Sequence, residues 1–147
     1  MHERILFLDI DGVLVTPRTE SIVIGQYSQF DSGCVAALNR IIASTGAKLV
    51  LCSSWRIDED INDLREYFLS QGVVGDLVDM TPVRSDADRE REILQWLGEC
   101  PSRPRFAILD DDLWFDQLSA WHVRTDSQQG LSADDVDATV ALLESSP

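Results

Sequence analysis

Two short apolar runs that each contain or end in aspartate constrain the fold of this chain most strongly. The first covers residues 4–10 (Arg-Ile-Leu-Phe-Leu-Asp-Ile) and the second covers residues 105–110 (Arg-Phe-Ala-Ile-Leu-Asp). Residues 48–52 (Lys-Leu-Val-Leu-Cys) form a third apolar run, which has no aspartate. Near-continuous apolar runs of this length are typical of strands that are buried on both faces of a parallel sheet. We therefore expect a parallel sheet with helices packed on both sides.

Other segments carry apolar residues at helical spacing or short strand-like runs. Helices are predicted over residues 31–46, 58–72, 86–97 and 132–143, the last opened by a Ser-Ala-Asp-Asp capping box. Two further short strands are expected within residues 73–80 and 120–125, and residues 16–30 are predicted to form a loop or small flap. This alternation predicts a single domain spanning residues 1–147, a three-layer α/β sandwich with a mainly parallel sheet and right-handed crossovers.

Two of these helices have a well-defined expected apolar face. For the helix within residues 58–72 the face is predicted to comprise Ile61, Leu64, Phe68 and Leu69. The next helix is predicted to bury Ile93, Trp96 and Leu97 and to be broken by Gly98 and Pro101.

The composition excludes several classes of protein. The chain has 12 lysines and arginines against 26 aspartates and glutamates, a net charge of −14, so strong unaided binding to nucleic acid is not expected. Three cysteines cannot all pair within one chain, which favours a reducing, cytoplasmic location. No stretch approaches the ~18 apolar residues of a membrane span, and the N-terminal run is too short for a signal peptide, so neither membrane insertion nor export is expected.

Aspartates gather at the predicted strand ends. Asp9, Asp11, Asp110 and Asp111 lie at or just past the ends of two strands, where open α/β sheets bind their ligands. Any one of them alone fits an ordinary loop aspartate, but four together favour a functional site. Two like charges about 4 Å apart repel by roughly 4 kcal/mol at an effective dielectric near 20, so the cluster must take up protons or bind a cation. Oxygen ligands alone suit Mg²⁺.

A phosphate group could be held at the end of the second predicted strand. Ser53 and Ser54 follow its apolar residues, and hydroxyls with free backbone N–H groups at a strand-to-helix turn bind phosphate. Ser53, the first polar residue after the run, is the better candidate. The alternative is that either serine simply caps the following turn.

An arginine is expected to supply the positive charge for that phosphate. The only lysine, Lys48, begins its strand and therefore lies at the opposite edge of the sheet. Arg89 is the preferred candidate because the N-terminal end of its helix lies at the carboxyl edge of the sheet. Arg56 and Arg84 remain open as alternatives, and an exposed arginine paired with a neighbouring acid is the non-functional interpretation.

These residues together resemble a known family. Residues 8–13 (Leu-Asp-Ile-Asp-Gly-Val) resemble the Asp-x-Asp-Gly-[Val/Thr] signature of the haloacid dehalogenase-like (HAD) hydrolases, which are mostly phosphatases. Ser53 is similar to the family's strand-ending Ser/Thr, Arg89 to its Lys/Arg and Asp110-Asp111 to its acidic pair, although arginine replaces the commoner lysine. Residues 53–56, 89–97 and 109–111 are similar, more narrowly, to small HAD domains found alongside RNA-repair proteins.

The resemblance implies a HAD-like Rossmannoid fold and a Mg²⁺-dependent phosphatase that acts through an aspartyl phosphate. Asp9 would be the nucleophile, and Asp11 would be the general acid and base. The metal would be held by Asp9, the backbone carbonyl of Asp11 and Asp110, with Asp111 as a ligand or as a residue that orients one.

The resemblance also bears on the substrate. Ser53 and Arg89 would bind the non-bridging phosphate oxygens, with Ser54 and Arg56 as further substrate-binding candidates. The connections on either side of Ser53 are too short for a large cap domain. Family members without a cap domain resemble enzymes that accept the ends of macromolecules as substrates. The resemblance therefore implies a phosphorylated substrate that is a nucleotide, a nucleic-acid end or a phosphoprotein.

Two other functions compete with this one. A phospho-receiver domain would need its acceptor aspartate at the end of a middle strand, and residues 49–56 contain no aspartate. A non-enzymatic binding or regulatory module on a HAD scaffold is the second alternative. The complete set of acids argues against it, but only a phosphate-release assay separates the two.

Overall fold

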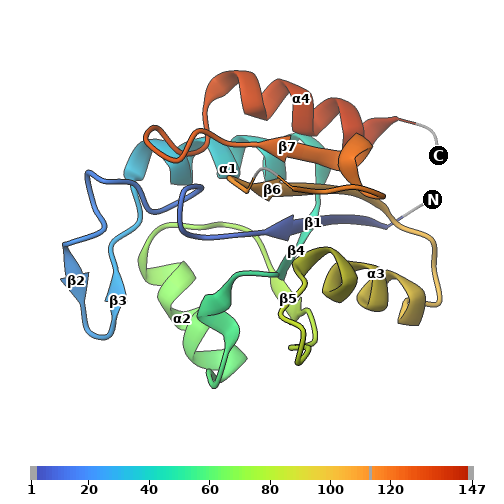
Figure 1. The fold of residues 1–147 in the computed structure, drawn as a ribbon. Coiled ribbons are helices and arrows are strands. Elements are labelled where there is room, and N and C mark those ends of the chain that lie inside the picture. The colour runs from blue at the N-terminus through green and yellow to red at the C-terminus, as the bar shows by residue number, and fades with distance from the viewer. Residues whose placement is uncertain (1–2, 113, 146–147) are drawn as a thin grey trace.

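The computed structural model describes residues 3–112 and 114–145 (Figure 1). Its main sheet has five parallel strands in the order β5-β4-β1-β6-β7, which confirms the predicted α/β class. The strands are β1 (Arg4–Leu8), β4 (Lys48–Leu51), β5 (Leu77–Met80), β6 (Arg105–Asp110) and β7 (His122–Arg124).

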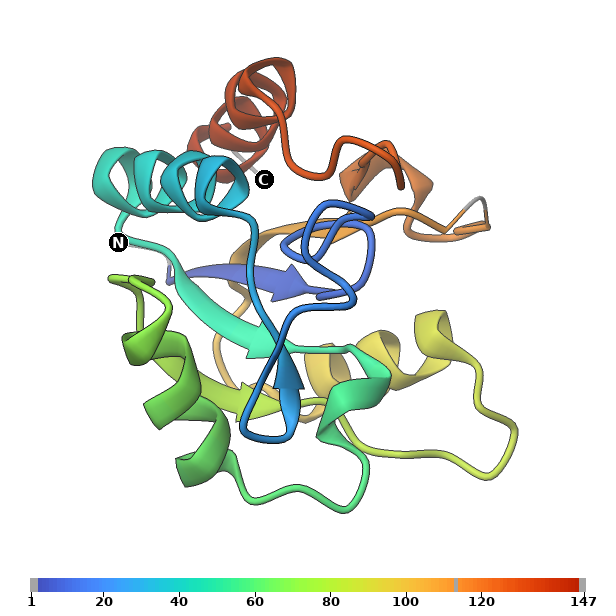
Figure 2. The same cartoon turned by 90° about the vertical axis from the view of Figure 1, so that its left-hand side faces the viewer.

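Four α-helices cover the two faces of this sheet. They are α1 (Ser32–Thr45), α2 (Ile61–Ser70), α3 (Arg89–Glu99) and α4 (Ala133–Glu144), and the short 3-10 turns are η1 (Ser54–Arg56) and η2 (Ser119–Trp121). Helices α1, α2 and α4 pack on one face and α3 packs on the other (Figures 1 and 2). The three predicted layers are therefore present.

Strand β1 contributes side chains to the hydrophobic clusters on both faces of the sheet. Leu6 and Leu8 pack into the cluster beneath α1, α2 and α4, whereas Ile5 and Phe7 pack with Ile93 of α3. All five side chains are fully buried. Burial on both faces explains why the sequence of this strand is apolar at consecutive positions rather than at alternate ones.

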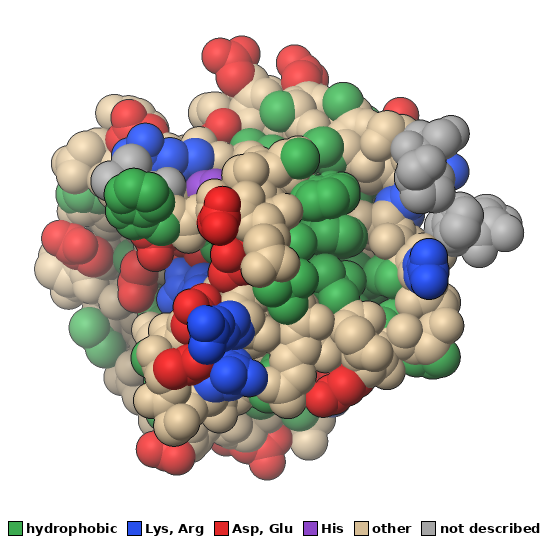
Figure 3. Space-filling model, turned by 45° about the vertical axis from the view of Figure 1, so that its right-hand side comes forward, with side chains coloured by type: hydrophobic (Ala, Val, Ile, Leu, Met, Phe, Trp, Pro, Cys, Tyr) green, Lys and Arg blue, Asp and Glu red, His purple; other side chains and the backbone are tan. Residues whose placement is uncertain are grey.

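The α3 side of the sheet is covered less completely than the other side. The connection from β6 to β7 contains no α-helix among its described residues, only η2, and contributes the buried side chains of Phe115 and Leu118. Phe106 and Trp96 are partly buried, and Trp121 is 38% exposed. Figure 3 shows hydrophobic side chains gathered at the surface of this part of the molecule.

The predicted flap contains a small hairpin. Strands β2 (Val23–Ile24) and β3 (Tyr27–Ser28) pair in antiparallel fashion within residues 16–30. In Figure 2, which looks onto the carboxyl edge of the parallel strands, this hairpin stands in front of the sheet. No cap domain is present in the described part of the chain, as the connection lengths predicted.

Two details of the predicted helices were wrong. Leu69 is 72% exposed, because the buried face of α2 is set by Leu64 and Phe68 and Leu69 lies about 100° beyond Phe68. Helix α3 begins at Arg89, where the carboxylate of Asp88 accepts the cap hydrogen bond, and it continues through Gly98. A glycine in the last turn lowers helix stability by only about 1 kcal/mol.

Among the described residues, no helix combines the length and the apolar character needed to cross a membrane. The three cysteines are free thiols.

Candidate active site

Acidic side chains from two neighbouring strands meet at the carboxyl edge of the sheet. Strands β1 and β6 pair with Leu8 opposite Leu109, and the backbone N–H of Asp9 donates to the carbonyl of Leu109 at 3.0 Å. One carboxylate oxygen from each of Asp9, Asp110 and Asp111 lies within 4.8 Å of the other two. The two strands are thus neighbours, as the acid pattern required.

Between β1 and β6 the order in which strands are added to the sheet also changes direction. From β1 the chain continues through α1 to β4, and from β6 it continues to β7 on the opposite side. In open α/β sheets, such a switch point leaves a crevice at the carboxyl ends of the strands. Asp9, just after β1, and Asp110, at the end of β6, lie at this switch point.

Burial and mutual repulsion disfavour the charged forms of the acids. Asp9 is 5% exposed and Asp110 is fully buried. Burial raises the pKa of Asp9 most, and the neighbouring Asp110 raises it further, while Arg89 and the Ile10 N–H only partly offset these effects, so the pKa is about 8. Burial and Asp110 likewise raise the pKa of Asp111. Without a cation, this cluster must hold protons.

Arg89 is the arginine that contacts the acids. It occupies the first position of α3, and its Nη1 lies 2.7 Å from Oδ2 of Asp110 and 3.2 Å from Oδ2 of Asp9. Burial opposes its charge, but the two carboxylates outweigh this effect and raise the pKa of the guanidinium above its ordinary value. Arg89 is therefore placed to neutralise part of the cluster.

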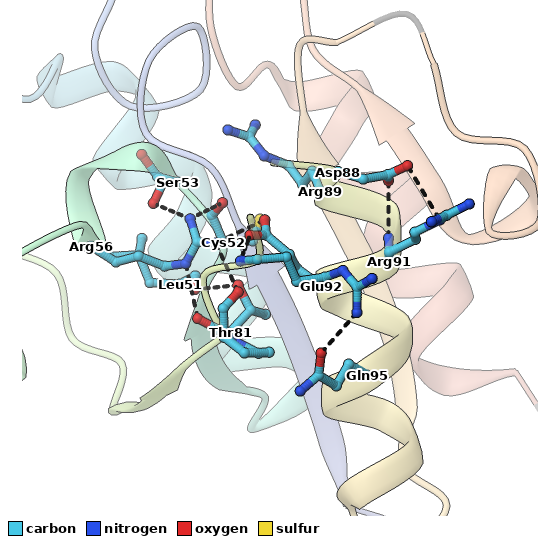
Figure 4. A network of polar contacts seen from close by, with 12 residues as sticks. Leu51, Cys52, Ser53, Arg56, Thr81, Asp88, Arg89, Arg91, Glu92 and Gln95 are labelled. Carbon is cyan, nitrogen blue, oxygen red and sulfur yellow. Dashed lines mark hydrogen bonds and ion pairs between the residues drawn. The ribbon is translucent and has the colours of Figure 1, made fainter. Parts of the chain in front are cut away.

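The structure gives Arg56 a different role from the predicted contact with a substrate phosphate. Its guanidinium is buried and forms an ion pair of 2.8 Å with the buried Glu92 of α3 (Figure 4). Its N–H groups also donate to the backbone carbonyls of Cys52, Ser53, Thr81 and Pro82. All five guanidinium donors are thereby used, so Arg56 fastens the end of β4 and the loop after β5 to α3.

Arg84, the other alternative, also lies away from the acid cluster. Its guanidinium donates to the carboxylate of Asp86 and to the side-chain oxygen of Gln95. Its backbone N–H donates to Glu92. Arg84 thus shapes the loop before α3.

Ser53 and Ser54 form the start of the η1 turn. Ser53 is fully buried, and its Oγ accepts a hydrogen bond of 3.1 Å from the backbone N–H of Trp55. This is the capping role that the sequence left open. The cap uses the oxygen as an acceptor, so the hydroxyl hydrogen can still be donated. Ser54 is exposed.

The Asp11 carboxylate is not part of the three-carboxylate group. Its Oδ2 accepts a hydrogen bond of 3.2 Å from the indole Nε1 of Trp55. This contact between Trp55 and Asp11 was not predicted from the sequence. No periodicity marks Trp55, because its position depends on how η1 folds back toward the loop after β1.

Gly12 is required by the close approach of Asp111. Its φ is +80°, and a Cβ at this position would collide with the carboxylate of Asp111. The carbonyl of Gly12 accepts a hydrogen bond of 2.7 Å from the hydroxyl of Thr125. A residue without a side chain is therefore needed for the acids to pack together.

Backbone and side-chain groups hold the end of β6, where Asp110 lies. The N–H of Asp112 donates to Oδ1 of Asp110 at 2.9 Å. The carbonyl of Asp110 lies 2.9 Å from Nε2 of His122 and accepts from the N–H of Thr125 at 3.1 Å. Sequence reasoning gave His122 no role in the site, and its contact depends on the pairing of β6 with β7.

The residues present fit a bound divalent cation. Three carboxylates, two of them buried, supply hard oxygen donors within one small volume. Mg²⁺ binds through one or two carboxylates and keeps coordination positions for water and substrate phosphate. Asp9, Asp110 and Asp111 would hold it, and the Asp11 carboxylate lies outside the group.

The fold and the acid cluster define a HAD-like domain. The chain belongs to the family described as the HAD domain in Swiss Army Knife RNA repair proteins, whose model matches residues 5–136. HAD domains are in general hydrolases and typically use Mg²⁺. A search of the curated proteins gave no match.

Proposed function

We propose that this protein is a Mg²⁺-dependent phosphatase that hydrolyses phosphate monoesters through an aspartyl-phosphate intermediate. The observation that supports it best is the convergence of Asp9, Asp110 and Asp111 with Arg89 at one edge of the sheet. A carboxylate nucleophile, ligands for a cation and a positive charge for phosphate oxygens are thus within reach of one another.

In the first step a carboxylate oxygen of Asp9 attacks phosphorus. The bond from phosphorus to the ester oxygen breaks, and its electron pair stays on that oxygen, which takes a proton from the carboxyl group of Asp11. Bound Mg²⁺ would supply charge stabilisation for the phosphoryl oxygens and keep Asp9 ionised. Arg89, whose Nη1 lies 3.2 Å from Asp9, would supply a further positive charge near the nucleophile.

In the second step water hydrolyses the aspartyl phosphate. The Asp11 carboxylate takes a proton from the water as its oxygen attacks phosphorus. The bond from phosphorus to the Asp9 oxygen breaks, which releases inorganic phosphate and restores the Asp9 carboxylate and protonated Asp11. Ser53, whose hydroxyl hydrogen is available, is proposed to donate to a phosphate oxygen.

The substrate is proposed to be an exposed phosphate on a nucleotide, a nucleic-acid end or a phosphoprotein. The described residues contain no cap domain, only the small β2–β3 hairpin in front of the carboxyl edge, which favours access for large substrates. The family's link to RNA-repair proteins favours nucleic-acid ends. Because the chain carries a net charge of −14, a partner would have to strengthen binding to a long nucleic acid. The proposed compartment is the cytoplasm.

A phosphate-release assay tests this function. Mononucleotides, oligonucleotides phosphorylated at the 3′ or 5′ end and phosphopeptides are offered with Mg²⁺ at low salt. We expect turnover that ends on addition of a chelator and in Asp9→Asn, and that persists in the control Asp137→Asn on the exposed side of α4. Phosphate release by Asp9→Asn at the wild-type rate would refute the mechanism. Binding without any turnover would favour a regulatory module.

A further inference from the structure

The hydrogen bond between Trp55 and Asp11 joins the proposed proton donor to an aromatic cluster. The two side chains come from different strand ends, since Asp11 follows β1 and Trp55 follows β4. The indole N–H donates to Oδ2 of Asp11 at 3.2 Å, and the Asp11 side chain is exposed. An exposed carboxylate without such a contact would populate several rotamers.

Trp55 is itself held in one orientation. Its ring stacks on Tyr27 of the β2–β3 hairpin, with ring centroids 5.3 Å apart and 14° between the planes. The ring centroids of Phe30 and Tyr67 lie 6.0 Å and 6.4 Å from that of Trp55. The hydroxyl of Tyr27 donates to Glu59 at 3.0 Å, which fastens the hairpin to the segment after η1. Packing therefore fixes the orientation of the indole ring whose N–H donates to Asp11.

This contact distinguishes the two oxygens of Asp11. In a protonated carboxyl group the carbonyl oxygen is a better acceptor than the hydroxyl oxygen, so the indole N–H on Oδ2 favours the form that carries its hydrogen on Oδ1. Oδ1 is then the atom that can pass a proton to the ester oxygen. Proton transfer requires donor and acceptor within about 2.6–3.2 Å, so an Asp11 carboxyl group with a fixed rotamer is more effective than a mobile one.

We propose that Trp55 is a positioning residue for Asp11, and that its indole N–H makes the enzyme effective on esters whose leaving groups need protonation. This inference rests on the proposed phosphatase function. An ester with a poor leaving group depends on the proton from Asp11, whereas one with a good leaving group departs without it. Trp55 thereby favours phosphate esters with poor leaving groups, such as alkyl and phenyl esters, over esters with good leaving groups.

The test compares two esters in Trp55→Phe. Phenylalanine keeps a ring for stacking on Tyr27 but has no N–H. The measured quantity is kcat/KM for phenyl phosphate and for p-nitrophenyl phosphate, because this constant covers the steps up to loss of the leaving group. We expect the ratio of the two constants to shift against phenyl phosphate by about tenfold, a fraction of the 10²–10⁴ that general acids contribute. Trp121→Phe is the control, because Trp121 stacks on Phe106 at 5.1 Å on the α3 side; both esters should react as in the wild type.

A second variant separates positioning from packing. In an Asp11→Asn background, Trp55→Phe should cause no further shift in the ratio, since the proton donor is already absent. In amide spectra of ¹⁵N-labelled protein, Asp11→Asn should also move the Trp55 indole resonance, which is assigned by its loss in Trp55→Phe.

The outcomes separate the inference from the function on which it rests. An equal loss on both esters in Trp55→Phe, or a full shift in the Asp11→Asn background, would overturn the role of Trp55 while leaving the phosphatase intact. A wild-type protein that hydrolyses neither ester with Mg²⁺ would instead refute the proposed function, and with it the inference.

Discussion

At the scale of single residues, Gly12 offers a sharp test of the acid cluster. Gly12→Ala would place a methyl group where the Asp111 carboxylate lies, at a backbone φ of +80°. We expect Asp111 to be displaced and the affinity for Mg²⁺ to fall by about 10-fold or more, the scale on which residues supporting metal ligands act. Isothermal titration with Mg²⁺ measures the change.

Gly25→Ala is the matched control for this substitution. Gly25 also has a positive φ, +66°, but an added Cβ would meet no atom within 4 Å. It should lower stability by about 1 kcal/mol through backbone strain and leave the Mg²⁺ affinity unchanged. If the wild type, Gly12→Ala and Gly25→Ala bound Mg²⁺ with equal affinity, Asp111 would take no part in metal binding.

The residues whose placement could be predicted from sequence are those that lie at a strand end. Asp9 and Asp110 were found in this way, because consecutive apolar residues mark where each strand stops. Arg56 was misassigned, since only the structure shows that Glu92 and the surrounding carbonyls use its donors. The hydrogen bond from Trp55 to Asp11 could not be predicted, because the two residues lie 44 positions apart in the chain.

At the scale of elements, the Arg56–Glu92 ion pair is expected to hold α3 in register with β4. Both side chains are buried, and the ion-pair distance is 2.8 Å. Glu92→Gln leaves the guanidinium without its counter-charge, and removal of one partner of a buried pair typically costs about 3–5 kcal/mol. Urea unfolding measures the loss. Because Arg89 lies one turn earlier on α3, phosphatase activity should fall as well.

The control for this pair is Arg91→Met on the same helix. Arg91 forms ion pairs with Asp86 and Asp88 but is 64% exposed, and exposed pairs contribute little. Its midpoint of unfolding should stay close to that of the wild type. If Glu92→Gln were no less stable than Arg91→Met, the buried pair would not organise α3.

The N-terminus of α1 should make stability depend on pH. The carboxylate of Asp31 caps this helix. Burial opposes its ionisation, but hydrogen bonds from Arg18, Thr16 and the Gly33 N–H outweigh burial and hold its pKa below the ordinary 3.8. A lowered carboxyl pKa stabilises the folded state above pH 3.8, and this contribution is lost as the pH falls through the lower folded-state value.

Asp31→Asn tests this pH dependence, because asparagine also caps helices but cannot titrate. Between pH 5 and pH 3, a range set by the ordinary pKa of 3.8, the unfolding midpoint of the wild type should fall further than that of Asp31→Asn. The two proteins should converge at low pH. Parallel curves over the whole range would contradict a lowered pKa for Asp31.

Among the elements, predictability followed the strength of the periodic signal. Strands β1, β4 and β6 were predicted because burial on two faces demands continuous apolar sequence, and α1 was predicted from its caps at Asp31 and Gly46. The β2–β3 hairpin lies on the surface, and its exposed Val23 and Ile24 do not alternate with buried residues. Its position over the carboxyl edge is set by tertiary contacts, such as the stack of Tyr27 on Trp55.

At the scale of the whole molecule, topology rather than composition creates the site. The order β5-β4-β1-β6-β7 makes β1 and β6 neighbours although about 100 residues separate them. The composition, with its net charge of −14, would by itself suggest a poor phosphate binder. A bound cation together with Arg89 would reverse that charge at one point, and the proposed chemistry requires this local reversal.

The central claim is that Asp9 accepts a phosphoryl group with the help of a cation held by its neighbours. The most direct measurement is to quench the protein in acid during turnover of a phosphate monoester, trap the acyl phosphate by borohydride reduction, and locate the modified residue by peptide mass spectrometry. We predict modification at Asp9 alone, present with Mg²⁺, and absent with a chelator or in Asp9→Asn. Turnover without modification of Asp9, or with modification of another residue, would contradict the account.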